Sequence, residues 1–121
     1  MSEESRPGRP EPRVATESER RLLEILVTRA QGLRVDASWL DQLQVQPMDD
    51  GGMGSLRLQV DTSGGIRRFG RCASELRFRD VDGVLVVATL NIDDAGLPFE
   101  LDMWKTNFEP LKAIPEDLAI E

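Results

Sequence analysis

The residues best suited to chemistry are two adjacent aspartates in a glycine-rich segment, Asp49-Asp50-Gly51-Gly52-Met53-Gly54. Two carboxylates in a flexible loop can bind a hard cation through oxygen, and Met53 can contact a partner protein. The segment lacks the alternating acids and closing glutamate of a calcium loop, and the lysine and helix of a phosphate loop. We therefore predict a hairpin connection whose glycines adopt positive φ. Partner contact through Asp49, Asp50 and Met53 is the first alternative, and metal binding the second.

A second candidate is the pair Glu100 and Asp102, which lie on one face of a predicted strand and could act as an acid/base couple. No third group is apparent that would orient them. Five arginines on one strand could form an anion site: Arg67, Arg68, Arg71, Arg77 and Arg79. Cross-strand pairing, with Arg77 stacked on Trp104, explains the arginines equally well. The alternative function is thus a small carboxylate-based enzyme or ligand-binding protein.

Missing residue types limit the chemistry further. The sequence has no histidine, no tyrosine and one cysteine, which removes Ser-His and Cys-His nucleophile pairs and most zinc ligands. Cys72 has small neighbours and no histidine to activate it, so we predict a buried thiol that acts as a small hydrophobe. We expect a protein that is not an enzyme, with no cofactor and no metal site.

The composition predicts one globular domain and a cytoplasmic location. The chain has 121 residues, of which 40% are hydrophobic and 31% charged. Its net charge of −7 argues against non-specific nucleic-acid binding and is compatible with a basic partner protein. No apolar run approaches the roughly 20 residues of a membrane helix, and the first residues lack a signal-peptide core. A single cysteine excludes an internal disulfide and fits a reducing compartment.

The N-terminal half contains the predicted helices. Residues 1–13 are rich in charge and proline, which predicts a disordered tail before a single domain over 14–121. A capping box at Thr16-Glu17-Ser18-Glu19 and an apolar stripe predict an amphipathic helix over 17–31. Asp36 would cap a short helix over 37–42, with Trp39 and Leu40 facing inward.

Alternating apolar residues then predict strands over 42–47, 55–61 and 66–80, followed by two more between Val84 and Lys105. The third is irregular, because Ile66 and Phe69 have opposite parity, and a bulge near Gly70 would reconcile them. The fold class is therefore α+β: the N-terminal amphipathic helix packs on one face of an antiparallel meander of about five strands.

Turn chemistry fixes the register of the last three strands. A three-residue loop at 81–83 pairs Phe78 with Val86, and a two-residue turn at 95–96 pairs Leu90 with Leu101 and Ile92 with Phe99. We assign the four aspartates beside these turns to bonds with nearby backbone amides: Asp80, Asp82, Asp93 and Asp94.

The same register predicts the outer face of the sheet. Its apolar end holds Leu85, Val87 and Trp104, edged by Arg77 and Arg79, and these five are our main partner-contact candidates. Its polar end has one row of Glu75, Thr89 and Asp102 and a second of Ala73, Asn91 and Glu100. We expect the residues after Lys105, including Phe108, Leu111, Ile114 and Leu118, to fold back over part of this face.

Three segments resemble an uncharacterised family of small bacterial proteins that contain a domain of unknown function: MDDGGMGSLR, DVDGV and FELDMWK. The likeness spans roughly residues 19–115. It implies a bacterial cytoplasmic protein, with no activity, cofactor or catalytic residue to carry over. Size and acidity are also similar to those of immunity proteins of toxin systems. Our leading hypothesis is a non-catalytic module that binds a protein partner or self-associates.

Overall fold

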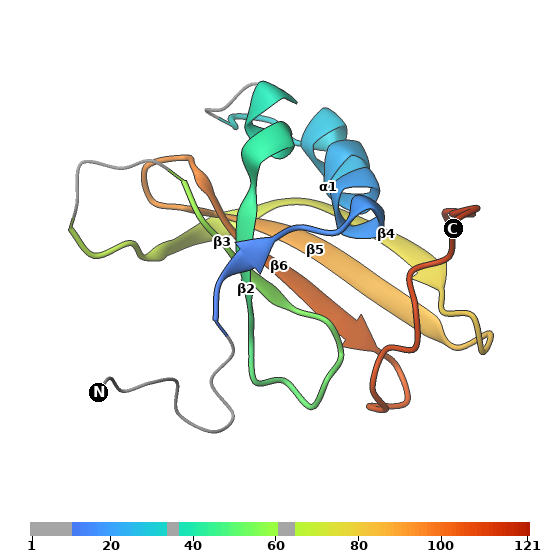
Figure 1. The fold of residues 1–121 in the computed structure, drawn as a ribbon. Helices are drawn as coiled ribbons and strands as arrows, with labels where there is room; N and C mark the ends of the chain where they lie inside the picture. Colours follow the sequence, from blue (N-terminus) through green and yellow to red (C-terminus); the bar gives the residue numbers. More distant parts are fainter. Residues whose placement is uncertain (1–10, 34–36, 61–64) are drawn as a thin grey trace, which may run out of the picture.

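The computed structural model describes residues 11–33, 37–60 and 65–121 (Figure 1). One α-helix, one 3₁₀ helix and six strands make up this part of the chain. In order they are β1 (Arg13–Val14), α1 (Glu17–Arg29), η1 (Ala37–Gln42), β2 (Gln44–Pro47), β3 (Leu56–Leu58), β4 (Phe69–Arg79), β5 (Leu85–Asp93) and β6 (Pro98–Lys105).

The predicted α+β class is confirmed, because α1 packs on one face of an antiparallel sheet (Figure 1). The strand order is β1-β2-β3-β6-β5-β4, so two three-stranded meanders meet where β3 pairs with β6. Strands β3 to β6 thus form a Greek key, which the meander prediction lacked. Arg67, just before β4, contacts the ends of three strands: it donates hydrogen bonds to the carbonyl oxygens of Leu58 and Pro98 and pairs with Asp93.

The helix begins as predicted. The Thr16 hydroxyl accepts a hydrogen bond from the Glu19 amide at 3.2 Å, and the Glu19 carboxylate accepts one from the Thr16 amide at 2.9 Å. The helix ends at Arg29, two residues before the predicted end, because Ala30 is already extended. Leu22, Leu23 and Leu26 of its apolar stripe are fully buried.

The flanking segments refine the predicted boundaries. Arg13, which we expected in the tail, lies in β1 opposite Val45, while residues 1–10 and Asp36 lie outside the described residues. The short helix has 3₁₀ geometry. Its predicted inward anchors hold, since Leu40 is buried and the Trp39 indole donates to the Gln59 carbonyl oxygen at 3.2 Å.

The middle strands are shorter than predicted. β2 begins at Gln44, β3 covers only Leu56–Leu58, and β4 begins at Phe69, so Ile66 lies outside the strand and is 85% exposed. The predicted bulge near Gly70 is confirmed by a register shift between Phe69 and Arg71. A second, unpredicted shift follows between Cys72 and Ser74.

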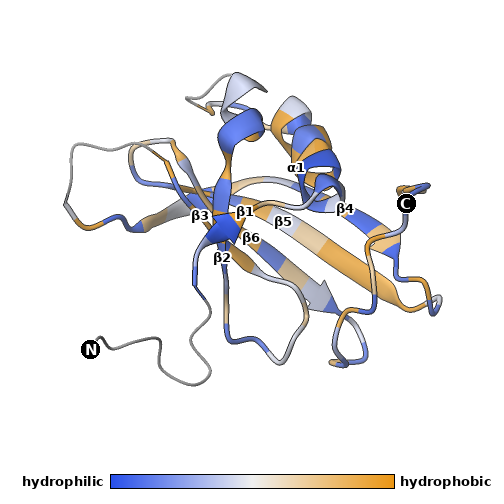
Figure 2. Cartoon of the chain, viewed as in Figure 1, coloured by the Kyte–Doolittle hydropathy of each residue, from blue (hydrophilic) through white to orange (hydrophobic). Residues whose placement is uncertain are grey.

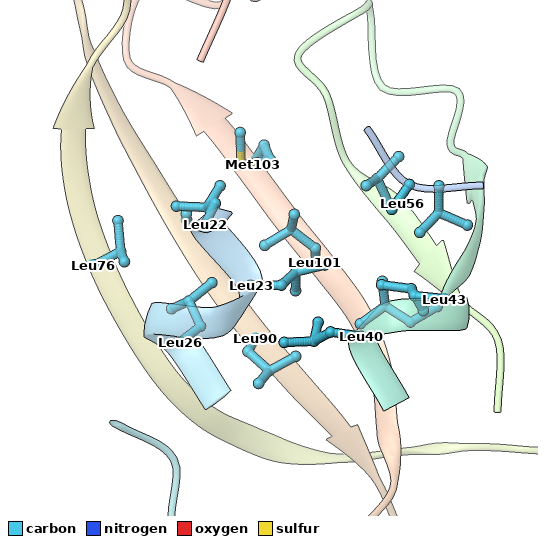
Figure 3. Packing of buried hydrophobic residues seen from close by; sticks show 14 of the residues in the cluster. Leu22, Leu23, Leu26, Leu40, Leu43, Leu56, Leu76, Leu90, Leu101 and Met103 are labelled. Atoms are coloured by element: carbon cyan, nitrogen blue, oxygen red, sulfur yellow. The ribbon is translucent and has the colours of Figure 1, made fainter. Parts of the chain in front are cut away.

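The core lies between α1 and the sheet. Apolar and polar residues alternate around α1 in Figure 2, and the apolar side chains of α1 and the strands meet in Figure 3. The predicted pairs Phe78–Val86 and Leu90–Leu101 are confirmed. The cluster comprises Ala15, Leu22, Leu23, Leu26, Leu40, Leu43, Val45, Leu56, Leu58, Leu76, Phe78, Val86, Ala88, Leu90, Leu101 and Met103.

One predicted pair is wrong. Ile92 pairs with Pro98 instead of Phe99, because a bulge interrupts the β5–β6 register and the turn has three residues, with Gly96 at φ 85°. The Asp93 amide accordingly donates to the Leu97 carbonyl oxygen at 2.8 Å. Phe99 is buried outside the main core, between the guanidinium groups of Arg57 and Arg67, each 5.2 Å from its ring centroid.

The C-terminal segment corrects a further expectation. It passes to the side of the sheet that carries α1, where Leu111, Ile114, Leu118 and Ile120 pack against the core (Figure 1). Backbone bonds hold it there: the Leu111 amide donates to the Gly52 carbonyl oxygen, and the Glu121 amide to that of Arg77. Leu111, Ile114 and Leu118 therefore complete the core and do not cover the outer face.

Candidate functional site

The predicted apolar end of the outer face exists and is open to solvent. Arg77 lies opposite Val87, Val87 opposite Trp104, and Arg79 opposite Leu85, as the register predicted. Trp104 is 45% exposed, and Leu85 and Val87 are half-buried. The sheet thus presents an indole ring and two aliphatic side chains on one face.

Phe108 joins this surface, although we expected it to be buried. Its ring centroid lies 6.1 Å from that of Trp104, at an interplanar angle of 53°, and its side chain is 71% exposed. Its φ of 64° is unusual for a residue other than glycine, and its amide donates to the Lys105 carbonyl oxygen at 2.8 Å. Such strain tends to occur at functional sites. We call Leu85, Val87, Trp104 and Phe108 the outer apolar patch.

The two arginines beside the patch differ in their contacts. Arg79 pairs with Glu121 at 2.7 Å and also donates to the Gly83 carbonyl oxygen. Arg77 is exposed, and no carboxylate of the described residues forms a salt bridge with it. Among the described residues, the arginines that lie over an aromatic ring are Arg57 and Arg67, so the predicted stacking of Arg77 on Trp104 is not formed.

The polar end is only partly as predicted. Glu75, Thr89 and Asp102 form one row. In the next row Cys72, not Ala73, lies opposite Asn91, because of the second register shift in β4. This shift also leaves Cys72 exposed, so the prediction of a buried thiol is wrong.

Glu100 and Asp102 are engaged in local contacts. Glu100 forms a salt bridge with Arg57 at 3.2 Å, and Asp102 accepts a hydrogen bond from the Ser55 hydroxyl at 3.3 Å. A shallow hollow of about 400 Å³ lies nearby, over Phe99 and Arg57. Neither Glu100 nor Asp102 lines this hollow.

The Asp49–Gly54 segment is held by its own side chains. Asp50 accepts hydrogen bonds from the amides of Met53 and Ser55, at 3.1 and 3.0 Å. Met53 directs its sulfur at the Lys105 amide, and Asp49 is exposed. The glycines have positive φ as predicted. Within the described ranges, no group of three or more His, Cys, Asp or Glu residues is arranged to hold a metal.

A buried lysine with two aspartates forms an ion cluster that the sequence did not predict. The Lys105 side chain is fully buried, and its Nζ donates to Asp80 and Asp82 at 2.7 Å each and to the Pro110 carbonyl oxygen at 3.2 Å. The strand alternation indicated this position, because Lys105 has the same parity as Leu101 and Met103, which face the core. Its partners come from the hairpin between β4 and β5, which lies beside the end of β6.

This cluster, the Lys105 clamp (Lys105, Asp80 and Asp82), also fixes the C-terminal segment, because Asp80 accepts from the amides of Lys112 and Ala113. Burial alone would raise the pKa of Asp80, but hydrogen bonds from Lys105 and these amides outweigh it and hold that pKa below 3.8. Burial likewise would lower the pKa of Lys105, and bonding to both carboxylates raises it above 10.5. The cluster is therefore a charged structural clamp.

Asp93 plays a matching role at the other end of β5. It accepts from the amides of Ala95 and Leu97 at 2.9 Å each and from Arg67 Nε at 2.9 Å. Burial would raise the pKa of Asp93, but the Leu97 amide and Arg67 hold it below 3.8. The predicted turn chemistry is thus confirmed for Asp80, Asp82 and Asp93, with cations that the sequence did not reveal.

These shifts predict how stability depends on pH. Asp80 and Asp93 have folded pKa values below 3.8. Their contribution to the free energy of unfolding is therefore complete above that pH and is lost as the pH falls through the folded values. Lys105 contributes fully below 10.5 and loses its contribution as the pH rises through its higher folded value. We expect thermal unfolding followed by circular dichroism to show a plateau between about pH 5 and 9. In Asp93→Asn the unfolding midpoint should fall less between about pH 5 and acid pH than in wild type. An unchanged fall would show that Asp93 does not contribute to the acid dependence.

A family model described as a domain of unknown function, DUF6984, matches residues 12–115. No curated protein and no solved structure matches the chain. None of the helices in the described ranges is long and apolar enough to cross a membrane.

Proposed function

The chain belongs to the DUF6984 family, a domain of unknown function, and we propose that it is a non-catalytic module that binds a protein partner through the outer apolar patch. The exposed aromatic pair carries this proposal: Trp104 is 45% and Phe108 71% exposed, next to two aliphatic side chains on an uncovered sheet face. Clustered exposed apolar residues mark interaction sites. Trp and Arg, both present here, are also enriched among the residues that dominate binding energy.

The charge distribution supports a specific contact. Arg77 lies beside the patch without a carboxylate from the described residues, so a partner group that brings one would gain a charge-assisted hydrogen bond. The alternative, a carboxylate-based enzyme, is less well supported. Glu100 is paired with Arg57 and Asp102 accepts a hydrogen bond from Ser55, and neither lines the hollow over Phe99 and Arg57.

We propose a bacterial cytoplasm as the setting, in line with the single cysteine and the segments quoted above. An immunity role is a narrower version of the same proposal, supported only by small size and acidity. A toxin reading frame beside the gene would favour it. Neighbouring genes of unrelated kind would count against it.

Trp104→Ala is expected to weaken binding of the partner about 30-fold, since truncating a central aromatic residue of an interface costs about 2 kcal/mol. The partner would be captured from the native host with the tagged wild-type chain, identified, purified and titrated by calorimetry. Phe69→Ala is the matched control, because Phe69 is an aromatic residue that is 57% exposed and lies at the end of β4 that is far from the outer apolar patch. Equal affinities for wild type and Trp104→Ala would refute the proposed function.

A further inference from the structure

We propose that the occupant of the outer apolar patch is a second copy of this chain, in a symmetric dimer whose two-fold axis runs along β5. This inference rests on the proposed function, and it names the partner. It follows from how the outer side chains are distributed over β4, β5 and β6.

The patch has a centre and two different sides. Leu85 and Val87 of β5 form the centre, Arg77 of β4 lies on one side, and Trp104 of β6 lies at the same height on the other. A two-fold axis parallel to β5, just above the outer face, places Leu85 and Val87 against the same residues of the second copy. It also exchanges the sides, so that each Arg77 faces Trp104 of the other copy. Two-fold dimers require such a self-complementary surface.

The two sides of the patch are complementary, because one carries a cation and the other an aromatic ring and a carboxylate. Arg77 forms no salt bridge with a carboxylate of the described residues. In the dimer it would meet the indole of Trp104 in the second copy, and the segment of that copy that carries Phe108 and the exposed Glu109. A guanidinium over an aromatic ring, with a carboxylate beside it, forms a cation–π contact and a salt bridge. A second copy makes both contacts twice.

Charge limits the contact to the apolar end. The row of Glu75, Thr89 and Asp102 carries two acids, and in the proposed arrangement this row of one copy would lie near that of the other. Repulsion there leaves the row solvated at the margin. A contact restricted to one end of three strands is in the size range of weak, transient interfaces. The dimer should therefore form at high protein concentration and dissociate on dilution.

The first experiment measures mass against concentration by light scattering. We expect the apparent mass of wild type to rise from 13.5 kDa toward twice that value, and Trp104→Ala to keep the mass of a monomer. Phe69→Ala should behave as wild type, because Phe69 lies away from the patch.

The second experiment tests the position of the axis. In Cys72→Ser protein, Val87→Cys should be cross-linked between copies by a short bis-maleimide, since facing sheets lie about 10 Å apart. Wild type is the control, because its exposed Cys72 lies on the same face but at the other end of β4. A circular dichroism spectrum checks that each variant is folded.

The outcomes separate this inference from the proposed function. A dimer that needs Trp104 and is cross-linked through Val87→Cys supports the inference. A monomer at all concentrations, or cross-linking no better at Val87→Cys than at Cys72, overturns it. If the chain is a monomer and a captured partner needs Trp104, the proposed function stands without the inference. If neither self-association nor partner binding needs Trp104, both are wrong.

Discussion

Replacing Lys105 with methionine is expected to lower the midpoint of thermal unfolding by about 10 to 20 °C. Methionine fills much of the same space, but it leaves the carboxylates of Asp80 and Asp82 without their shared cation. Asp80 is 3% exposed, so its unpaired charge would stay largely desolvated. The Pro110 carbonyl oxygen would also lose its donor.

Lys112→Met is the matched control, since Lys112 is exposed and contributes its backbone amide to Asp80. We expect its unfolding midpoint to remain within about 2 °C of wild type. Hydrogen exchange gives a second readout: in Lys105→Met the amides of Lys112 and Ala113 should exchange much faster than in wild type. Wild-type protection at these amides would show that the clamp does not hold the C-terminal segment.

The clamp shows which parts of this fold a sequence can predict. Periodicity and capping chemistry act over a few residues, and they predicted α1, its capping box and the inward faces of β5 and β6. The hairpin at Gly83 is equally local, and its register was correct. These features depend on neighbours in the chain.

What could not be predicted depends on contacts between distant segments. The pairing of β3 with β6 joins segments that lie far apart in the chain, and no local pattern encodes it. The bulges that move Phe99 out of the main core and expose Cys72 each shift the register of a neighbouring strand against β5. The ion pairs of Lys105 were not predicted, because its carboxylates come from another hairpin.

The outer apolar patch lies between these cases. Strand parity was enough to place Leu85, Val87 and Trp104 together. Whether the face was open depended on the C-terminal segment, which the Lys105 clamp holds on the other side of the sheet. The clamp thus keeps the proposed interaction surface free of the C-terminal segment.

Gly70→Ala is expected to destabilise the protein by about 3 kcal/mol, at the upper end for overpacking. A Cβ atom at this position would lie 2.4 Å from the carbonyl oxygen and 2.6 Å from the carbonyl carbon of Asp93. Both are backbone atoms of the β5–β6 hairpin, which cannot rotate away as a side chain can. The beginning of β4 would have to separate from β5, at the bulge where Phe69 faces Asp93.

Chemical denaturation of wild type, Gly70→Ala and Cys72→Ala measures this effect. Cys72 is two residues away and exposed, so its substitution should change the free energy of unfolding by less than about 0.5 kcal/mol. Separation of β4 from β5 would also disturb Asp93, which accepts from Arg67 and from two amides of its own turn. We therefore expect the loss of stability between neutral and acid pH to be smaller in Gly70→Ala than in wild type, as in Asp93→Asn. A variant as stable as wild type would mean that β4 can move without disturbing this hairpin, and the close approach at Gly70 would not be needed for the fold.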